Sequence, residues 1–137
     1  MSVRSFLDTN VLLYTDDHDT PAKQAKALAL FVQIRTDKTG VISTQVLQEY
    51  FPTATRQLGV PAAIARRKVE LFAHLDLVVL DLPDILSAID LHRLHQCSLW
   101  DALIVRAALQ AKCAMLYTED LQHGQRIEGL EIVNPFV

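Results

Sequence analysis

Four acidic residues of this chain stand where they could hold a divalent metal ion. Asp8 directly follows an apolar run, and Glu49 lies in an amphipathic helical stretch. Asp101 opens a nearly all-apolar segment, and Asp120 follows the short apolar run 114–117. Carboxylates without basic partners repel one another, so they are expected to share a pocket mainly where a cation binds. Oxygen ligands of this kind suit Mg²⁺ or Mn²⁺, and those ions suit phosphate chemistry. The leading hypothesis is a nuclease.

Each of these carboxylates also has a purely structural explanation. Asp8 could cap a helix that begins just after it, and Ser98 with Asp101 fits a capping box. Glu49 could simply lie at the edge of an apolar helix face. Asp120 belongs to an acidic loop in which turns closed by a side chain are common. Singly these residues are weak signals, but the four in this order are a strong one.

Short apolar runs alternate with stretches of helical periodicity. Short strands that are apolar on both faces point to a parallel sheet covered on two sides. Ligands of such sheets bind beyond the carboxyl ends of the strands, where Asp8 and Asp120 stand. The sequence therefore predicts an α/β fold of three layers, α/β/α, with a mainly parallel sheet of about five short strands in one domain, 1–137. The strands are expected at 3–7, 40–43, 77–82, 114–117 and 130–133, and the main helices near 20–35, 44–58 (bent or interrupted at Pro52), 61–74, 83–96 and 99–112.

Charge gives a mixed indication about nucleic acid. The formal net charge of −3 argues against such a partner, but a bound metal would cancel much of the acidic cluster locally. The basic residues are uneven, with Arg56 followed by the run Arg66, Arg67 and Lys68. These four are candidates for RNA contact, although a solvated helix face explains them equally well.

The remaining composition predicts a location in the cytoplasm. No apolar run is long enough to span a membrane, and no charged-then-apolar leader precedes the first strand. Cys97 and Cys113 are expected to be reduced thiols rather than a disulfide. Trp100 could stack on a base, but packing at the entrance of its helix is the expected role.

Five segments together resemble the PIN-domain family of metal-dependent ribonucleases, in particular the small VapC-like toxins of bacterial toxin–antitoxin pairs. The segments read FLDTNVL at 6–12, QEY at 48–50, SLWDALI at 98–104, LYTEDL at 116–121 and GLEIVNPF at 129–136. The segment at 98–104 is the most specific of the five, and the resemblance covers essentially the whole chain.

The resemblance implies roles for individual residues. Asp8 and Asp101 would hold Mg²⁺ or Mn²⁺ directly, and Glu49 and Asp120 would act through water or a second ion. All four acidic positions are filled, so nothing in the sequence suggests an inactive member of the family. The polar supports of the site would be Asn10, Ser98 and Thr118.

The function implied by this resemblance is hydrolysis of RNA phosphodiester bonds by the toxin of a type II toxin–antitoxin pair. Two protein partners are implied as well, namely a cognate antitoxin, whose tail commonly blocks the site with a basic side chain, and a second copy of the chain. Candidate contact residues, each of which could equally be core, are Leu28, Phe31, Val32, Ile64 and Phe72.

Two other functions compete with the ribonuclease hypothesis. A phosphatase of the haloacid-dehalogenase type also begins with an Asp after the first strand, but it usually has a second Asp two residues later, where this chain has Asn10. A non-catalytic RNA- or protein-binding module on the same fold is the stronger alternative, and the full acidic set argues against it. The sequence leaves open which RNA would be cut and whether one or two metal ions would bind.

Overall fold

The computed structural model describes residues 3–137. Its centre is a six-stranded sheet in the order β3-β2-β1-β4-β6-β5, in which neighbouring strands are parallel except for the antiparallel pair β5 and β6. The strands are β1 Ser5–Leu7, β2 Gly40–Ser43, β3 Asp76–Val78, β4 Met115–Tyr117, β5 Arg126–Ile127 and β6 Leu130–Val133.

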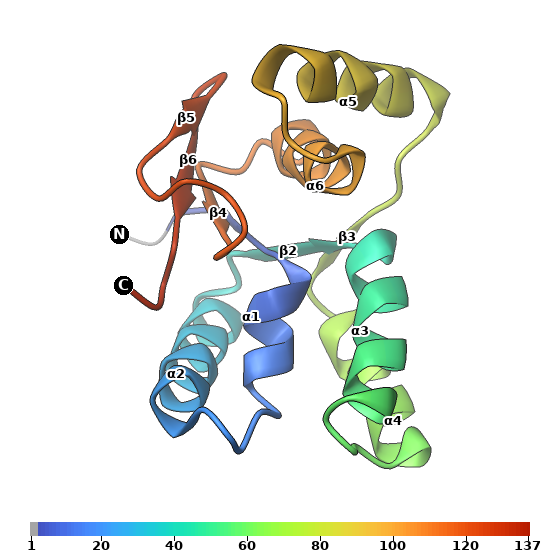
Figure 1. Ribbon diagram of the computed structural model, residues 1–137, viewed down its shortest axis with the longest axis vertical. Helices are drawn as coiled ribbons and strands as arrows, with labels where there is room; N and C mark the ends of the chain where they lie inside the picture. Colours follow the sequence, from blue (N-terminus) through green and yellow to red (C-terminus); the bar gives the residue numbers. More distant parts are fainter. Residues whose placement is uncertain (1–2) are drawn as a thin grey trace.

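Six helices cover the two faces of this sheet. The helices α1 to α4 lie on one face, and α5 and α6 lie on the other (Figure 1). The predicted three-layer α/β/α fold with a mainly parallel sheet is thereby confirmed. The helices are α1 Thr9–Tyr14, α2 Pro21–Asp37, α3 Thr44–Arg56, α4 Ala62–Phe72, α5 Leu82–His95 and α6 Leu99–Gln110.

Two expectations about the elements are wrong. The short strand β5 was missed, because two residues give no readable alternation, and only its pairing with β6 makes it a strand. Of the bend or interruption expected at Pro52, the interruption is wrong, because α3 runs through this residue. Proline inside a helix costs about 3 kcal/mol. Burial of Val46, Tyr50 and Ala54 on the core side of α3 offsets that cost.

The pairing of β1 with β4 fixes the centre of the molecule. Leu7 is in register with Tyr117, β1 is buried throughout, and Leu116 is buried at the middle of β4. The backbone N–H of Asp8 donates to the carbonyl of Tyr117 at 3.0 Å, so the parallel ladder continues one residue beyond β1. This register brings the residues that follow the two strands, Asp8 and Thr118, to the same edge of the sheet.

The two cysteines are free thiols, Cys113 buried and Cys97 half-buried, as the sequence predicts. Burial raises the pKa of Cys113 to about 11, so this thiol stays protonated and unreactive at neutral pH. Within residues 3–137, no helix combines the length and the apolar character that crossing a membrane requires.

Candidate metal site

Asp8 both caps a helix and faces the site. It is the N-cap of α1, and its Oδ1 accepts a hydrogen bond from the backbone N–H of Thr9 at 2.7 Å. Its Oδ2 accepts from the hydroxyl of Thr118 at 2.8 Å. The capping explanation and the functional one are therefore compatible, because each uses a different part of the same buried carboxylate.

Asp101 lies in the first turn of α6, and its carboxylate is not used for capping. Ser98 is the N-cap, and its hydroxyl accepts from the backbone N–H of Asp101 at 3.0 Å. The reciprocal half of the expected capping box, from the Asp101 carboxylate back to the Ser98 backbone, is not formed within the described part of the chain. Buried Ala102, Ile104 and Val105 anchor the helix, so the carboxylate has a fixed base.

Asp120 is held in place by the loop that follows β4. Its backbone N–H donates to the Thr118 hydroxyl at 3.0 Å, which closes a short turn. The amide of Asn10 donates to Asp120 Oδ2 at 3.0 Å and lies 3.4 Å from Asp8 Oδ2. Asn10 and Thr118 thus connect two of the acidic residues through neutral donors.

The loop contacts and the start of α6 bring three carboxylates together. One oxygen each of Asp8, Asp101 and Asp120 lie within 4.8 Å of one another, and the three residues are buried, half-buried and exposed in that order. Among residues 3–137, none of the three forms an ion pair with a basic side chain. A cluster of oxygens with only neutral donors around it fits a hard divalent cation.

Glu49 lies beside this group without belonging to it. Its Oε1 accepts from the hydroxyl of Thr9 at 2.7 Å, and its Oε2 accepts from the Gln45 amide at 3.3 Å. The carboxylate is close enough to raise the pKa of both Asp8 and Asp101. Glu49 and Asp120 were expected to share an outer role, but in the structure Asp120 lies with Asp8 and Asp101, and Glu49 flanks these three.

The electrostatics of the site favour a bound cation. Burial raises the pKa of Asp8 from 3.8 to about 7, against the lowering effect of hydrogen bonds from Thr118 and Thr9, and the charges of Asp120 and Glu49 raise it further. The pKa of Asp101 is raised for the same first reason, burial. A positive charge would reverse this penalty, because it favours the ionised form of each carboxylate.

Glu119, the neighbour of Asp120, is already neutralised. Lys23 forms an ion pair with it at 3.0 Å, and the Tyr14 hydroxyl donates to its Oε1 at 2.6 Å. The ring of Tyr14 packs edge-on against Phe136 near the end of the chain. These contacts fix the loop that carries Asp120 and explain why Glu119, although adjacent, does not join the acidic group.

The four basic candidates for RNA contact separate in the structure. Arg56, Arg66 and Arg67 are exposed, and Arg66 pairs with Glu70 one turn along α4. Lys68 instead binds the buried carboxylate of Asp16, so its charge is already engaged. Arg56 and Arg67 are the members of the predicted patch that form no ion pair within residues 3–137.

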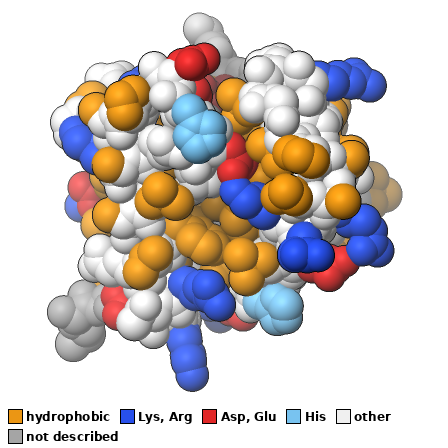
Figure 2. Space-filling model, turned by 90° about the horizontal axis from the view of Figure 1, so that it is seen from below, with side chains coloured by type: hydrophobic (Ala, Val, Ile, Leu, Met, Phe, Trp, Pro, Cys, Tyr) orange, Lys and Arg blue, Asp and Glu red, His pale blue; other side chains and the backbone are white. Residues whose placement is uncertain are grey.

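The five apolar residues expected at protein contacts also separate. Phe31 and Phe72 are buried and meet edge to face with ring centres 5.5 Å apart, so they belong to the core between α2 and α4. Leu28, Val32 and Ile64 are exposed. Figure 2 shows the molecule from below relative to the view of Figure 1. On this face, hydrophobic side chains gather in the centre, with Lys and Arg side chains around them.

A second exposed apolar surface was missed from the sequence. The outer side of α5 carries four exposed residues at helical spacing, since positions i, i+3, i+4 and i+7 share one face. Leu86, for example, is 53% exposed, and the other three residues of this face are apolar and exposed as well. We call this surface the α5 face, and its residues are Leu82, Ile85, Leu86 and Ile89.

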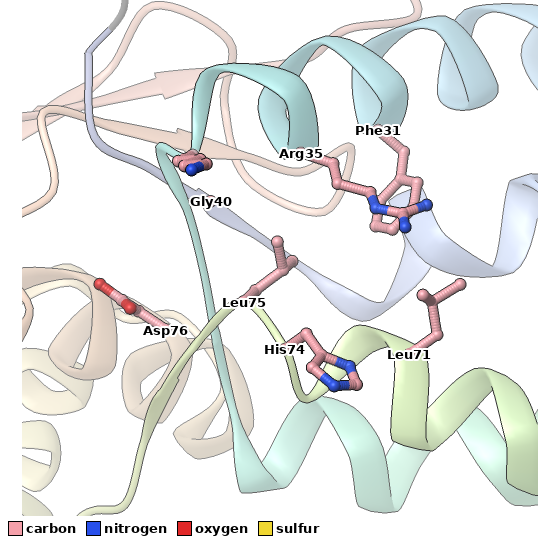
Figure 3. A pocket seen from close by; sticks show the side chains of 8 residues that line it. Phe31, Arg35, Gly40, Leu71, His74, Leu75 and Asp76 are labelled. Atoms are coloured by element: carbon pink, nitrogen blue, oxygen red, sulfur yellow. The ribbon is translucent and has the colours of Figure 1, made fainter.

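A cavity lies away from the acidic cluster. It has a volume of about 340 Å³ and lies between the C-terminal parts of α2 and α4, where Phe31 and Arg35 face Leu71 and His74 (Figure 3). Gly40, at the start of β2, borders it, and a Cβ atom there would come within 2.5 Å of Ile34. The cavity opens near the amino ends of β2 and β3, so it is separate from the site at their carboxyl ends.

Comparison with known proteins agrees with this architecture. The family model described as PIN domain matches residues 5–126. Among solved structures, the chain is similar to a toxin–antitoxin complex from Klebsiella pneumoniae, with a TM-score of 0.71, 18% identity, and coverage of 96% of this chain and 97% of that one. It is also similar to VapC20 from Mycobacterium tuberculosis, a toxin that cleaves the sarcin–ricin loop, with a TM-score of 0.68, 17% identity, and coverage of 82% and 86%.

A third similar structure is VapBC2 from Rickettsia felis bound to a DNA fragment from its promoter, with a TM-score of 0.66, 19% identity, and coverage of 93% and 96%. Comparison with curated protein sequences finds no match. At these identities the solved structures establish the shared fold, and the family model establishes the family.

Proposed function

The chain belongs to the PIN-domain family, and on that premise we propose that it is a metal-dependent endoribonuclease that hydrolyses RNA phosphodiester bonds. The observation that carries this proposal is the convergence of Asp8, Asp101 and Asp120, whose oxygens lie within 4.8 Å without a basic partner in residues 3–137. Mutual repulsion makes such a group costly unless a cation binds there. The biological role would be that of the toxin in a type II toxin–antitoxin pair.

The three carboxylates would hold Mg²⁺ or Mn²⁺, which when bound supplies positive charge to the phosphate and acidifies water. Thr118 and Asn10 orient the carboxylates of Asp8 and Asp120 through the hydrogen bonds described above. Glu49, which accepts hydrogen bonds from Thr9 and Gln45 and flanks the three carboxylates, would take the proton of the attacking water. No side-chain nucleophile is required.

The experiment that tests this proposal compares two substitutions that remove the same charge. Asp101→Asn should abolish Mg²⁺-dependent cleavage of single-stranded RNA, because the amide cannot ligate the ion as a carboxylate does. Asp90→Asn, at an exposed position on α5, should leave cleavage unchanged. Retention of near-full activity by Asp101→Asn would favour the alternative, a non-catalytic binding module on the same fold.

Two protein partners form part of the proposal. The α5 face is the better candidate for self-association, because four neighbouring apolar residues on one helix side are exposed there. The exposed Leu28, Val32 and Ile64 are candidates for antitoxin contact. Purification together with the product of an adjacent small gene, and loss of that association on Val32→Asp, would support this second assignment.

A further inference from the structure

A small cavity lies where the start of α3 meets the start of α6, and Trp100, the residue before Asp101, forms one of its walls. It has a volume of about 170 Å³, and its walls combine apolar Leu80, Ile85 and Leu103 with hydroxyl and amide groups. Pockets for drug-sized ligands occupy about 300–1,000 Å³, so this one suits a single ring system. The polar wall residues used below are Ser43, Gln45 and Gln48, with Trp100 as the aromatic wall.

Trp100 connects this cavity to the acidic cluster. It directly precedes Asp101, and its indole is 63% exposed, contrary to the expectation that it packs at the helix entrance. Its carbonyl accepts from the Gln45 amide at 3.1 Å, and the same amide donates to Glu49. The backbone of Trp100 is thus fixed next to Asp101, and its exposed side chain forms one wall of the cavity.

Ser43 gives an independent indication of a ligand. It lines the cavity at the start of α3, it is 3% exposed, and its hydroxyl has no hydrogen-bond partner within the described part of the chain. Nor does it cap the helix that it precedes. Buried polar groups are almost always paired, so an unpaired hydroxyl in a cavity wall indicates that a polar group of a ligand is missing there.

We propose that this cavity is a nucleotide subsite, which takes the base of the residue next to the scissile phosphate in single-stranded RNA. The base would stack on Trp100, and its polar edge or its ribose would meet the Ser43 hydroxyl and the Gln48 amide. This inference rests on the proposed function and adds the means by which the substrate is positioned. The unpaired Ser43 hydroxyl and the Gln48 amide favour a nucleotide as the occupant, and Ile85 of the α5 face lines the same cavity, so a second chain bound to that face would border the subsite.

Intrinsic fluorescence can test the subsite directly, because Trp100 is the only tryptophan of the chain. Titration of a short single-stranded oligoribonucleotide into the full chain in EDTA, which prevents metal-dependent cleavage, should quench this fluorescence in a saturable way. Trp100→Ala should weaken RNA binding about tenfold or more, as loss of base stacking does, measured by anisotropy of a labelled RNA. Trp100→Tyr should retain most of the affinity, and Ser43→Ala should weaken it by a smaller factor.

Leu94→Ala is the matched control, because Leu94 is 76% exposed on α5 and does not line the cavity. It should leave RNA affinity unchanged. RNA binding without quenching, or with equal affinity in Trp100→Ala, overturns the subsite. A change of oligomeric state in Trp100→Ala with unchanged RNA affinity would instead assign the cavity to a protein interface and also overturn it.

The subsite and the proposed function fail in different ways. RNA that binds and quenches but is not cleaved in Mg²⁺ contradicts the nuclease and leaves the subsite standing. Cleavage at full rate by Trp100→Ala contradicts the subsite and leaves the nuclease standing. RNA that is neither bound nor cleaved contradicts both.

Discussion

Asp8 should make the metal-free protein lose stability as the pH rises. Its pKa is 3.8 in the unfolded chain and about 7 in the folded one, chiefly because of burial. Between those values the folded state keeps a proton that the unfolded state has released. The stability that this proton contributes is complete below pH 3.8 and is lost as the pH rises through about 7.

The size of the effect follows from the two pKa values. At about 1.4 kcal/mol per pKa unit, the whole difference is on the order of 4 kcal/mol, and the part lost between about pH 5 and about pH 8 is roughly 2–3 kcal/mol. Asp8→Asn removes the titration, while its altered hydrogen bonds with Thr9 and Thr118 add a contribution that does not depend on pH. The difference in unfolding free energy between wild type and Asp8→Asn therefore varies with pH only through the titration of the Asp8 carboxylate.

Urea unfolding in EDTA across this pH range measures the effect. Relative to wild type, Asp8→Asn should gain roughly 2–3 kcal/mol of unfolding free energy from the lower to the higher pH. The difference between Asp90→Asn and wild type should stay flat, because that residue is exposed. Parallel pH profiles for wild type and Asp8→Asn would refute the reasoning, since they would mean that the Asp8 carboxylate is not held in a desolvated site. Addition of Mg²⁺ at the higher pH should stabilise wild type and not Asp8→Asn.

Three further outcomes follow from the surfaces and the buried ion pair. Neutralising Arg66 and Arg67 together should weaken RNA binding and flatten its salt dependence without a sequence preference, and an unaltered affinity across a salt series would leave them as a solvated helix face. Leu86→Glu should shift a dimer to monomer in analytical ultracentrifugation with the unfolding free energy nearly unchanged, and an unchanged sedimentation coefficient would contradict self-association through the α5 face. Lys68→Met should lower the free energy of unfolding in urea by about 2–3 kcal/mol, because it leaves the buried Asp16 without its cation. Arg66→Met, which breaks an exposed ion pair, should lower it by less than about 1 kcal/mol, and equal losses would contradict a stabilising buried pair.

Local sequence determined most of the architecture. The alternation of short apolar runs with helical periodicity placed five of the six strands and the three layers, because each pattern reports burial of a contiguous segment. Asp8 and Asp120 could be assigned to one edge of the sheet in advance, since the carboxyl ends of parallel strands share that edge. The predicted polar supports lie between these two residues, since Thr118 donates to the carboxylate of Asp8 and Asn10 donates to that of Asp120.

Tertiary structure alone decided which groups are available for chemistry. Sequence spacing could not show that Lys68 is engaged by Asp16, that Glu119 is neutralised by Lys23, or that Asp120 rather than Glu49 completes the central group. Each of these facts depends on contacts between segments far apart in the chain, and a single side-chain contact leaves no periodic signal. For the same reason the exposure of Trp100 was not predictable. Periodicity records which face of an element is buried on average, whereas a functional site depends on the individual side chains that the fold leaves unpaired.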